Sequence, residues 1–246
     1  MRNIKLKISY HGKYFSGWQV QNDVVTIQDE IEKSLKKILK ENIKLTGSGR
    51  TDTGVHAIEQ IANFKTENNK MSTDAFVRAL NSILKHGIKI MGAEEVDLEF
   101  NSRKSAKQKT YLYQIHNNRV ISALEDDFYF SPKYKLDFER MKEASKYFIG
   151  EHDFIAFAAA KNSTKTTIRT IFSIDWRTDG DKIFFEITGN GFLMKMVRNI
   201  MGTLIEIGNN RKDVNCIPDI IKSKDRNLAG ATAAAKGLFL KEVVYA

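Results

Sequence analysis

The order of predicted strands and helices in the first part of the chain recurs in the second part, and this repeat limits the choice of fold more than any other feature. In the first part, strand-like patterns of apolar residues occur at 4–10, 43–47, 58–66 and 88–98. Helical spacing of apolar residues predicts one helix behind Thr26, with Thr26 and Asp29 as its capping box, and a second helix over 73–85.

The second part of the chain repeats this order of elements. Its strand-like patterns occur at 109–116, 167–177, 182–188 and 237–244. Helices are predicted over 137–149 and 192–207, the latter with Met194 on its buried face, and a short helical piece lies near 218–223. The pair Asp179-Gly180 predicts a hairpin turn between two of the strands.

Each part therefore reads β-α-β-β-α-β, and this order determines the predicted fold. We expect an α+β protein with two ferredoxin-like halves that form a mostly antiparallel sheet, with the helices on one face. The predicted domains cover residues 1–107 and 108–246, and the first contains a glycine-rich loop between two strands. Sheet-and-helix modules of this kind are common in RNA-binding proteins.

Charge and composition restrict the partners and the compartment. The formal net charge is +9, spread over both halves, which favours a polyanionic partner, although a membrane surface also fits it. Cys216 is the only cysteine, so the chain has no internal disulfide, and we expect a reducing, cytoplasmic compartment. No apolar run reaches about 18 residues, and the first residues do not form a signal peptide, so we expect no membrane span.

The glycine-rich loop reads Gly-Ser-Gly-Arg-Thr-Asp-Thr-Gly-Val-His-Ala over residues 47–57. It places a single carboxylate, Asp52, between Arg50 and His56. A lone aspartate in such a loop is usually a turn residue that bonds its own backbone. The surrounding string changes this interpretation, because it resembles the Gly-Arg-Thr-Asp-Ala-Gly-Val-His signature of the tRNA pseudouridine synthase A family. Thr53 departs from it, since the family commonly has alanine there.

The resemblance extends over nearly the whole chain. Outside the loop it includes Gly17-Trp18-Gln19, the segment 196–199 (Met-Val-Arg-Asn) and the segment 224–233. It implies two ferredoxin-like halves with an RNA-binding cleft, and it implies an isomerase that converts uridine to pseudouridine at positions 38–40 in the anticodon arm of tRNA. It also implies a homodimer. His11 and His86 depart from the residues that the family often has at these places.

The resemblance also implies the roles of the site residues. Asp52 is the expected catalytic residue, Arg198 its ionic partner, and Tyr111 the ring that stacks on the target base. Whether Asp52 attacks C1′ or C6 of the nucleotide, or removes a proton from C2′, stays open. The isomerisation breaks and forms bonds within one nucleotide without a redox change, so we expect no cofactor and no metal. The five histidines have no ligand-like spacing.

Other cations are candidates for contact with RNA. Arg50 is expected to fill the gap left by the flipped base or to bind phosphate, and His56 to bind substrate or to order the loop by hydrogen bonding. Lys161, Lys165 and Arg169 lie in a segment rich in hydroxyls, as in phosphate-contacting loops, and a solvated loop fits equally well.

Two alternatives remain at this point. One is a non-catalytic RNA-binding module on the same scaffold. The other is an enzyme that acts on a phosphorylated small molecule, with residues 47–54 as the anion-binding loop. The aspartate at the centre of the loop would repel phosphate, so the second alternative is the weaker one.

Overall fold

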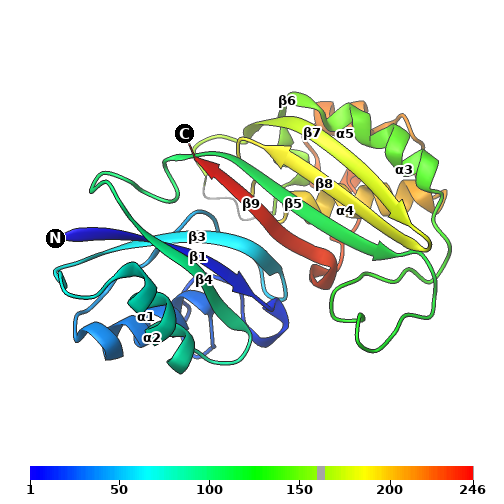
Figure 1. Cartoon of the computed structure of the whole chain (residues 1–246). Coiled ribbons are helices and arrows are strands. Elements are labelled where there is room, and N and C mark those ends of the chain that lie inside the picture. The colour runs from blue at the N-terminus through cyan, green and yellow to red at the C-terminus, as the bar shows by residue number, and fades with distance from the viewer. Residues whose placement is uncertain (160–163, 246) are drawn as a thin grey trace. The chain divides into compact units, whose positions relative to one another are not determined.

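The computed structural model describes residues 1–159 and 164–245, and its contacts divide the chain into two compact units. The first unit contains Met1–Lys107 and the segment from Phe239 onward, and the second contains Gln108–Leu238. In the described residues the chain forms nine strands and five α-helices (Figure 1). An α+β fold with mostly antiparallel strand pairs is thus confirmed.

The strands of the first unit follow the order β4-β1-β3-β9, with a short β2 on β3. Their bounds are β1 Arg2–Tyr10, β2 Thr46–Gly47, β3 His56–Thr66, β4 Ile88–Val96 and β9 Leu238–Tyr245. β1 pairs antiparallel with both β3 and β4, whereas β9 pairs parallel with β3, His56 lying opposite Phe239. The helices α1 (Ile27–Leu39) and α2 (Thr73–Ile83) cover one face of this sheet (Figure 1).

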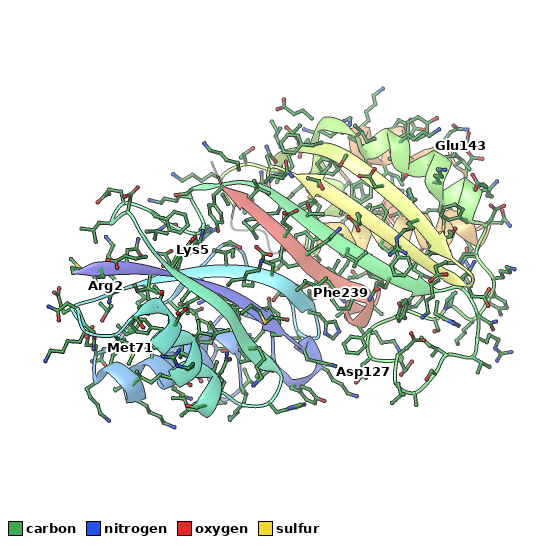
Figure 2. The ribbon with its side chains drawn as sticks, viewed as in Figure 1. Arg2, Lys5, Met71, Asp127, Glu143 and Phe239 are labelled. Carbon is green, nitrogen blue, oxygen red and sulfur yellow. The ribbon has the colours of Figure 1, made fainter. Side chains whose placement is uncertain are left out.

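The core of the first unit lies between this sheet and its two helices. Ile4, Leu6 and Ile8 alternate along β1 and are fully buried, as the period-two pattern predicts. Arg2, at the start of β1, links the strand to the segment before α2: its Nη1 donates a hydrogen bond to the backbone oxygen of Met71 at 2.7 Å (Figure 2). This framework fixes the strands that flank the glycine-rich loop.

The strands of the second unit follow the order β5-β8-β7-β6, and neighbouring strands are antiparallel. Their bounds are β5 Ala106–His116, β6 Gly150–Asp153, β7 Ile168–Asp179 and β8 Lys182–Gly189. The helices α3 (Phe138–Ser145), α4 (Met196–Gly208) and α5 (Cys216–Ser223) cover one face (Figure 1). The predicted turn at Asp179-Gly180 joins β7 to β8 and is confirmed.

Several predicted details are wrong. Thr26 precedes the helix but its side chain makes no capping bond, and Asp29 instead accepts a hydrogen bond from Lys33 at 2.6 Å. The helix predicted from residue 192 begins at Met196, because Lys195 has a left-handed backbone with φ of 61°, and Met194 lies before the helix and is exposed. β6 was not predicted, since it has only four residues and no alternating pattern.

The last strand groups differently from the sequence-based division. The pattern predicted residues 237–244 as the closing strand of the second half, whereas residues from Phe239 onward group with the first unit. The physical reason is the parallel pairing of β9 with β3. Whether the two units fold as separate domains stays a prediction.

Candidate active site

The loop that carries Asp52 connects β2 to β3 and is fixed through its backbone and its buried neighbours. The hydroxyl of Thr51 lies 2.8 Å from the hydroxyl of Tyr10, and both side chains are buried. The backbone N–H of Val55 donates to the backbone oxygen of Asp52 at 3.1 Å, which closes a turn around the carboxylate. Asp52 itself stays partly exposed. The arrangement therefore holds a carboxylate at the surface on a rigid base.

The segment Gly17-Trp18-Gln19 supports the same loop from the other side. The N–H of Trp18 donates to the backbone oxygen of Thr51 at 3.1 Å. Gly17 has a φ of 85°, and a Cβ at this position would lie 2.7 Å from the same oxygen. Only glycine allows both this backbone conformation and this close approach. The segment is therefore a structural part of the site.

Arg50 and His56 occupy different environments on the two sides of Asp52. Arg50 is exposed, and its Nε donates to Oε1 of Gln19 at 3.0 Å. His56 is only 1% exposed, and its ring stacks on Phe239 with 4.7 Å between centroids. Its Nδ1 accepts a hydrogen bond from the N–H of Gly12 at 3.1 Å, so a neutral ring carries its proton on Nε2. This geometry favours the loop-ordering role of His56 over direct substrate binding.

Sequence reasoning missed a buried amide that braces the loop. Gln60, on β3, is fully buried, accepts a hydrogen bond from the Ser48 hydroxyl at 2.6 Å, and donates to the backbone oxygen of Gly49 at 3.0 Å. The sequence offers little signal for this residue, because the same strand also contains Glu59 and Asn63. A buried amide needs partners, and Gln60 has them in the loop.

Arg198 lies in the first turn of α4 in the second unit and is held at the backbone of a neighbouring segment. Its Nε donates to the backbone oxygen of Ala233 at 2.8 Å, and the N–H of Ala233 donates to the backbone oxygen of Arg198 at 3.0 Å. Burial raises the pKa of the Tyr113 hydroxyl, and the nearby positive charge of Arg198 acts in the opposite direction. The Arg198 side chain is thus half-buried and fixed in orientation.

Tyr111 lies on β5 opposite Ile187 and is 8% exposed. Its ring meets Phe192 edge to face, with 5.1 Å between centroids. Two residues along the strand, Tyr113 is fully buried and donates its hydroxyl hydrogen to the backbone oxygen of Ala234 at 2.9 Å. Tyr113 is therefore a core residue of the second unit. The role of Tyr111 as a base platform stays a prediction.

The remaining predicted cations are placed as follows. Lys161 lies outside the described residues. Lys165 is exposed, while Arg169 is partly buried and donates from Nη1 to the backbone oxygens of Thr166 at 3.0 Å and Ile168 at 2.6 Å. Partial burial lowers the pKa of Arg169. Asp52 and Arg50 thus lie in the loop before β3 and His56 is the first residue of β3, all in the first unit. Arg198, Tyr111, Lys165 and Arg169 belong to the second unit.

Within residues 1–159 and 164–245, no group of three or more His, Cys, Asp or Glu side chains is arranged to hold a metal ion. In the same part, no helix has the length and apolar character needed to cross a bilayer.

Comparison with known proteins gives consistent matches. A family model described as tRNA pseudouridine synthase matches residues 8–103 and 144–246. The protein named tRNA pseudouridine synthase A is 45% identical over 245 residues in Acetivibrio thermocellus and 46% identical over 245 residues in Caldicellulosiruptor saccharolyticus. Both matches cover 100% of this chain and 100% of the relative. A protein of Clostridium tetani named tRNA pseudouridine synthase A 2 is 45% identical over 246 residues, which is 99% of each chain.

Proposed function

This chain belongs to the tRNA pseudouridine synthase family, and on that premise we propose that it isomerises uridine to pseudouridine in tRNA. The proposed targets are uridines at positions 38–40 of the anticodon arm, as the resemblance implies. The reaction breaks the N1–C1′ bond, turns the freed uracil and joins its C5 to the sugar. All the atoms of the product come from one nucleotide. The protein therefore has to open the stack, hold the base and supply one reactive group.

The observation that carries the proposal is the Asp52 loop. Its sequence resembles the family signature at every position but Thr53. Its backbone is held by Trp18 on one side and by Gln60 on the other, while the carboxylate stays partly exposed. A positioned carboxylate acts as a covalent nucleophile in several enzyme classes. We assign this role to Asp52.

Arg198 and Tyr111 complete the proposal. A guanidinium beside a carboxyl lowers the carboxyl pKa by about 1–3 units, so Arg198 would keep Asp52 ionised when a base covers it. The bond from its Nε to Ala233 supports this role, because it limits the rotation of the guanidinium. Stacking of a base on a tyrosine ring contributes about 1–3 kcal/mol. Tyr111 would in this way offset part of the few kcal/mol needed to flip a nucleotide.

Substitution of Asp52 tests the assignment. We expect Asp52→Asn to reduce the release of tritium from tRNA labelled at C5 of uridine to background, while the affinity for tRNA stays within about threefold of the native value, since the isosteric amide leaves the loop intact. Asp29→Asn, at a partly exposed position in the first turn of α1, is the matched control and keeps full turnover. Substantial turnover by Asp52→Asn would refute the role of Asp52.

The same assay separates the catalytic proposal from its rival. If the native chain bound tRNA tightly and released no tritium from any tRNA, it would be a non-catalytic RNA-binding module on this scaffold. Release of tritium only from tRNAs with a uridine at positions 38–40 would support the proposed target.

The assembly and the compartment are further parts of the proposal. We infer a homodimer from the family resemblance, and sedimentation equilibrium at micromolar concentration would test it. A cytoplasmic location is supported by the lone cysteine and by the tRNA substrate.

A further inference from the structure

One segment of the second unit lies along α4 and is joined to it by several hydrogen bonds. We call residues 226–233 the strap. The N–H groups of Gly230, Ala231 and Ala233 donate to Oγ1 of Thr203, to a carboxylate oxygen of Glu206 and to the backbone oxygen of Arg198, at distances of 2.8, 2.8 and 3.0 Å. The strap therefore follows α4 from its first turn to its third.

The strap and the helix also approach each other too closely for ordinary side chains. A Cβ on Gly202 of α4 would lie 1.6 Å from the backbone oxygen of Ala231. A Cβ on Gly230 of the strap would lie 2.7 Å from backbone atoms of Gly202. Backbone packs directly on backbone here, so the relative position of strap and helix is set with little freedom.

Arg226 forms hydrogen bonds both to α4 and to other residues of the strap. Its Nη2 donates to Oδ1 of Asn199 at 3.0 Å and to Oγ1 of Thr232 at 3.3 Å, and its Nη1 donates to the backbone oxygen of Ala229 at 3.3 Å. Thr232 donates in turn to Oδ1 of Asn199 at 2.7 Å. Asn199 is fully buried, and its amide donates to the backbone oxygen of Phe157 at 2.7 Å.

The geometry of these bonds connects Arg226 to Arg198. Asn199 follows Arg198 on the helix, and Thr232 precedes Ala233 on the strap. The bond between Asn199 and Thr232 is thus adjacent to the two bonds between Arg198 and Ala233, on the helix as well as on the strap. The orientation of the Arg198 guanidinium therefore depends on the position of the Ala233 carbonyl oxygen, which accepts the bond from Nε.

We propose that Arg226, through Asn199 and Thr232, is a positioning residue that holds the carbonyl of Ala233 and thereby aims the Arg198 guanidinium. This inference rests on the proposed function, because it gives Arg226 a task only if Arg198 serves the reaction. Arg226 touches no substrate in this scheme. Its three planar contacts need the forked guanidinium, which lysine does not provide.

Steady-state kinetics of single variants form the first test. We expect Arg226→Ala and Thr232→Val to lower kcat by about 10- to 100-fold, since small misplacements of a group near the chemistry have effects of this size. KM for tRNA should change by less than about threefold. Thr232→Ser keeps the hydroxyl and should restore most of kcat.

Arg140, on α3, offers a matched control, because it bonds to the other end of α4. Its guanidinium donates to the backbone oxygens of Ile207 at 3.4 Å and Lys212 at 3.3 Å, and so also joins α4 to a following segment. Arg140→Ala should lower the melting temperature about as much as Arg226→Ala and leave kcat within about twofold. Equal loss of kcat in both variants would mean that Arg226 only stabilises the unit, and would overturn the proposal.

A double-mutant cycle tests whether Arg226 acts through Arg198. In an Arg198→Ala background, the Arg226→Ala substitution should change residual turnover by less than about twofold. A further tenfold loss in that background would overturn the proposal, because it would show an effect independent of Arg198.

A readout without activity separates this inference from the proposed function. The Nε–H of Arg198, identified in ¹⁵N-edited NMR spectra by its loss in Arg198→Lys, should exchange slowly with water in the native chain and rapidly in Arg226→Ala. Arg140→Ala should leave the signal unchanged. An unchanged signal in Arg226→Ala would overturn the positioning role even if Asp52→Asn had confirmed the enzyme. If the native chain proved inactive, this signal would still report whether Arg226 holds Arg198.

Discussion

At the scale of single residues, Arg198 and Tyr113 bind neighbouring backbone oxygens of the same segment. Arg198 donates to Ala233 and Tyr113 donates to Ala234. The phenol is fully buried and neutral, whereas the guanidinium stays half-buried and charged. Burial has the larger effect on the Tyr113 hydroxyl and raises its pKa. The nearby charge of Arg198 stabilises the ionised form and so acts in the opposite direction.

This raised pKa predicts how stability depends on pH. A group whose pKa is higher in the folded state contributes stability that is fully present below its unfolded pKa, about 10 for tyrosine, and is lost as pH rises from there towards the folded pKa. We expect the free energy of unfolding to fall above about pH 10, and Tyr113→Phe to reduce the slope by up to about 1.4 kcal/mol per pH unit.

Urea unfolding between about pH 9 and about pH 11 would measure this slope. Tyr134→Phe is the control, because Tyr134 is 66% exposed and its replacement should leave the slope unchanged. Burial raises the pKa of Tyr10 and Tyr245 as well, so part of the loss should persist in the variant. A slope identical to that of the native chain would show that Tyr113 ionises as easily in the fold as in the unfolded chain.

Sequence reasoning at this scale identified residues that carry a motif and missed residues that support it. Asp52 and Arg198 stand in recognisable strings, so a resemblance could assign them roles. Gln60 and Arg226 act through hydrogen bonds to residues 11 and 27 positions earlier in the chain, Gly49 and Asn199. Such partners are set by the fold, and no local spacing predicts them.

At the scale of elements, the site depends on loops held by backbone contacts. Period-two and helical patterns predicted most strands and helices, because each of these elements buries one face. They failed where backbone geometry decided the outcome: at Lys195, whose left-handed conformation delays α4, and at the four-residue β6. β2 is also shorter than predicted, since only Thr46 and Gly47 pair with β3.

Gly17 gives an element-scale prediction. Gly17→Ala adds a Cβ 2.7 Å from Thr51 O at a φ of 85°, so we expect the unfolding free energy to fall by about 1–3 kcal/mol. Turnover should fall as well, because the residue beside Asp52 must shift. Thermal unfolding and tritium release would measure the two effects.

Gly92, on β4, is the control for this substitution. A Cβ at Gly92 meets no atom within 4 Å, and Gly92→Ala should leave both stability and turnover near native values. If Gly17→Ala behaved like Gly92→Ala, the close approach of the two backbones would have no energetic consequence.

At the scale of the whole molecule, charge determines how the chain meets RNA. Several carboxylates are already paired with lysines, among them Glu94 with Lys5, Glu59 with Lys7 and Glu30 with Lys85. The 39 lysines and arginines exceed the 30 aspartates and glutamates, so an excess of cations remains for phosphate groups. The pattern is typical of binding through many weak, non-specific contacts.

We therefore expect the affinity for tRNA to fall at least about tenfold as salt rises from about 50 mM to about 200 mM, which corresponds to two or more phosphate contacts. The release of condensed counterions from the phosphates is the physical reason. Fluorescence anisotropy with labelled tRNA over this range would give the slope, and Asp52→Asn should show the same slope because it changes no cation. An affinity independent of salt would contradict a binding surface made of cations.

Because the ribosome makes the chain from its amino end, β9 can pair with β3 only late in synthesis. Residues 108–238 must all be translated before Phe239 (labelled in Figure 2) exists. The growing chain therefore leaves His56 and Ala57 of β3 without their partners in β9, and the His56 ring without Phe239, for on the order of ten seconds. During that interval this short stretch of strand edge is available to chaperones or to a neighbouring nascent chain. The loop that carries Asp52 gains its last support only when the ribosome has finished the second unit.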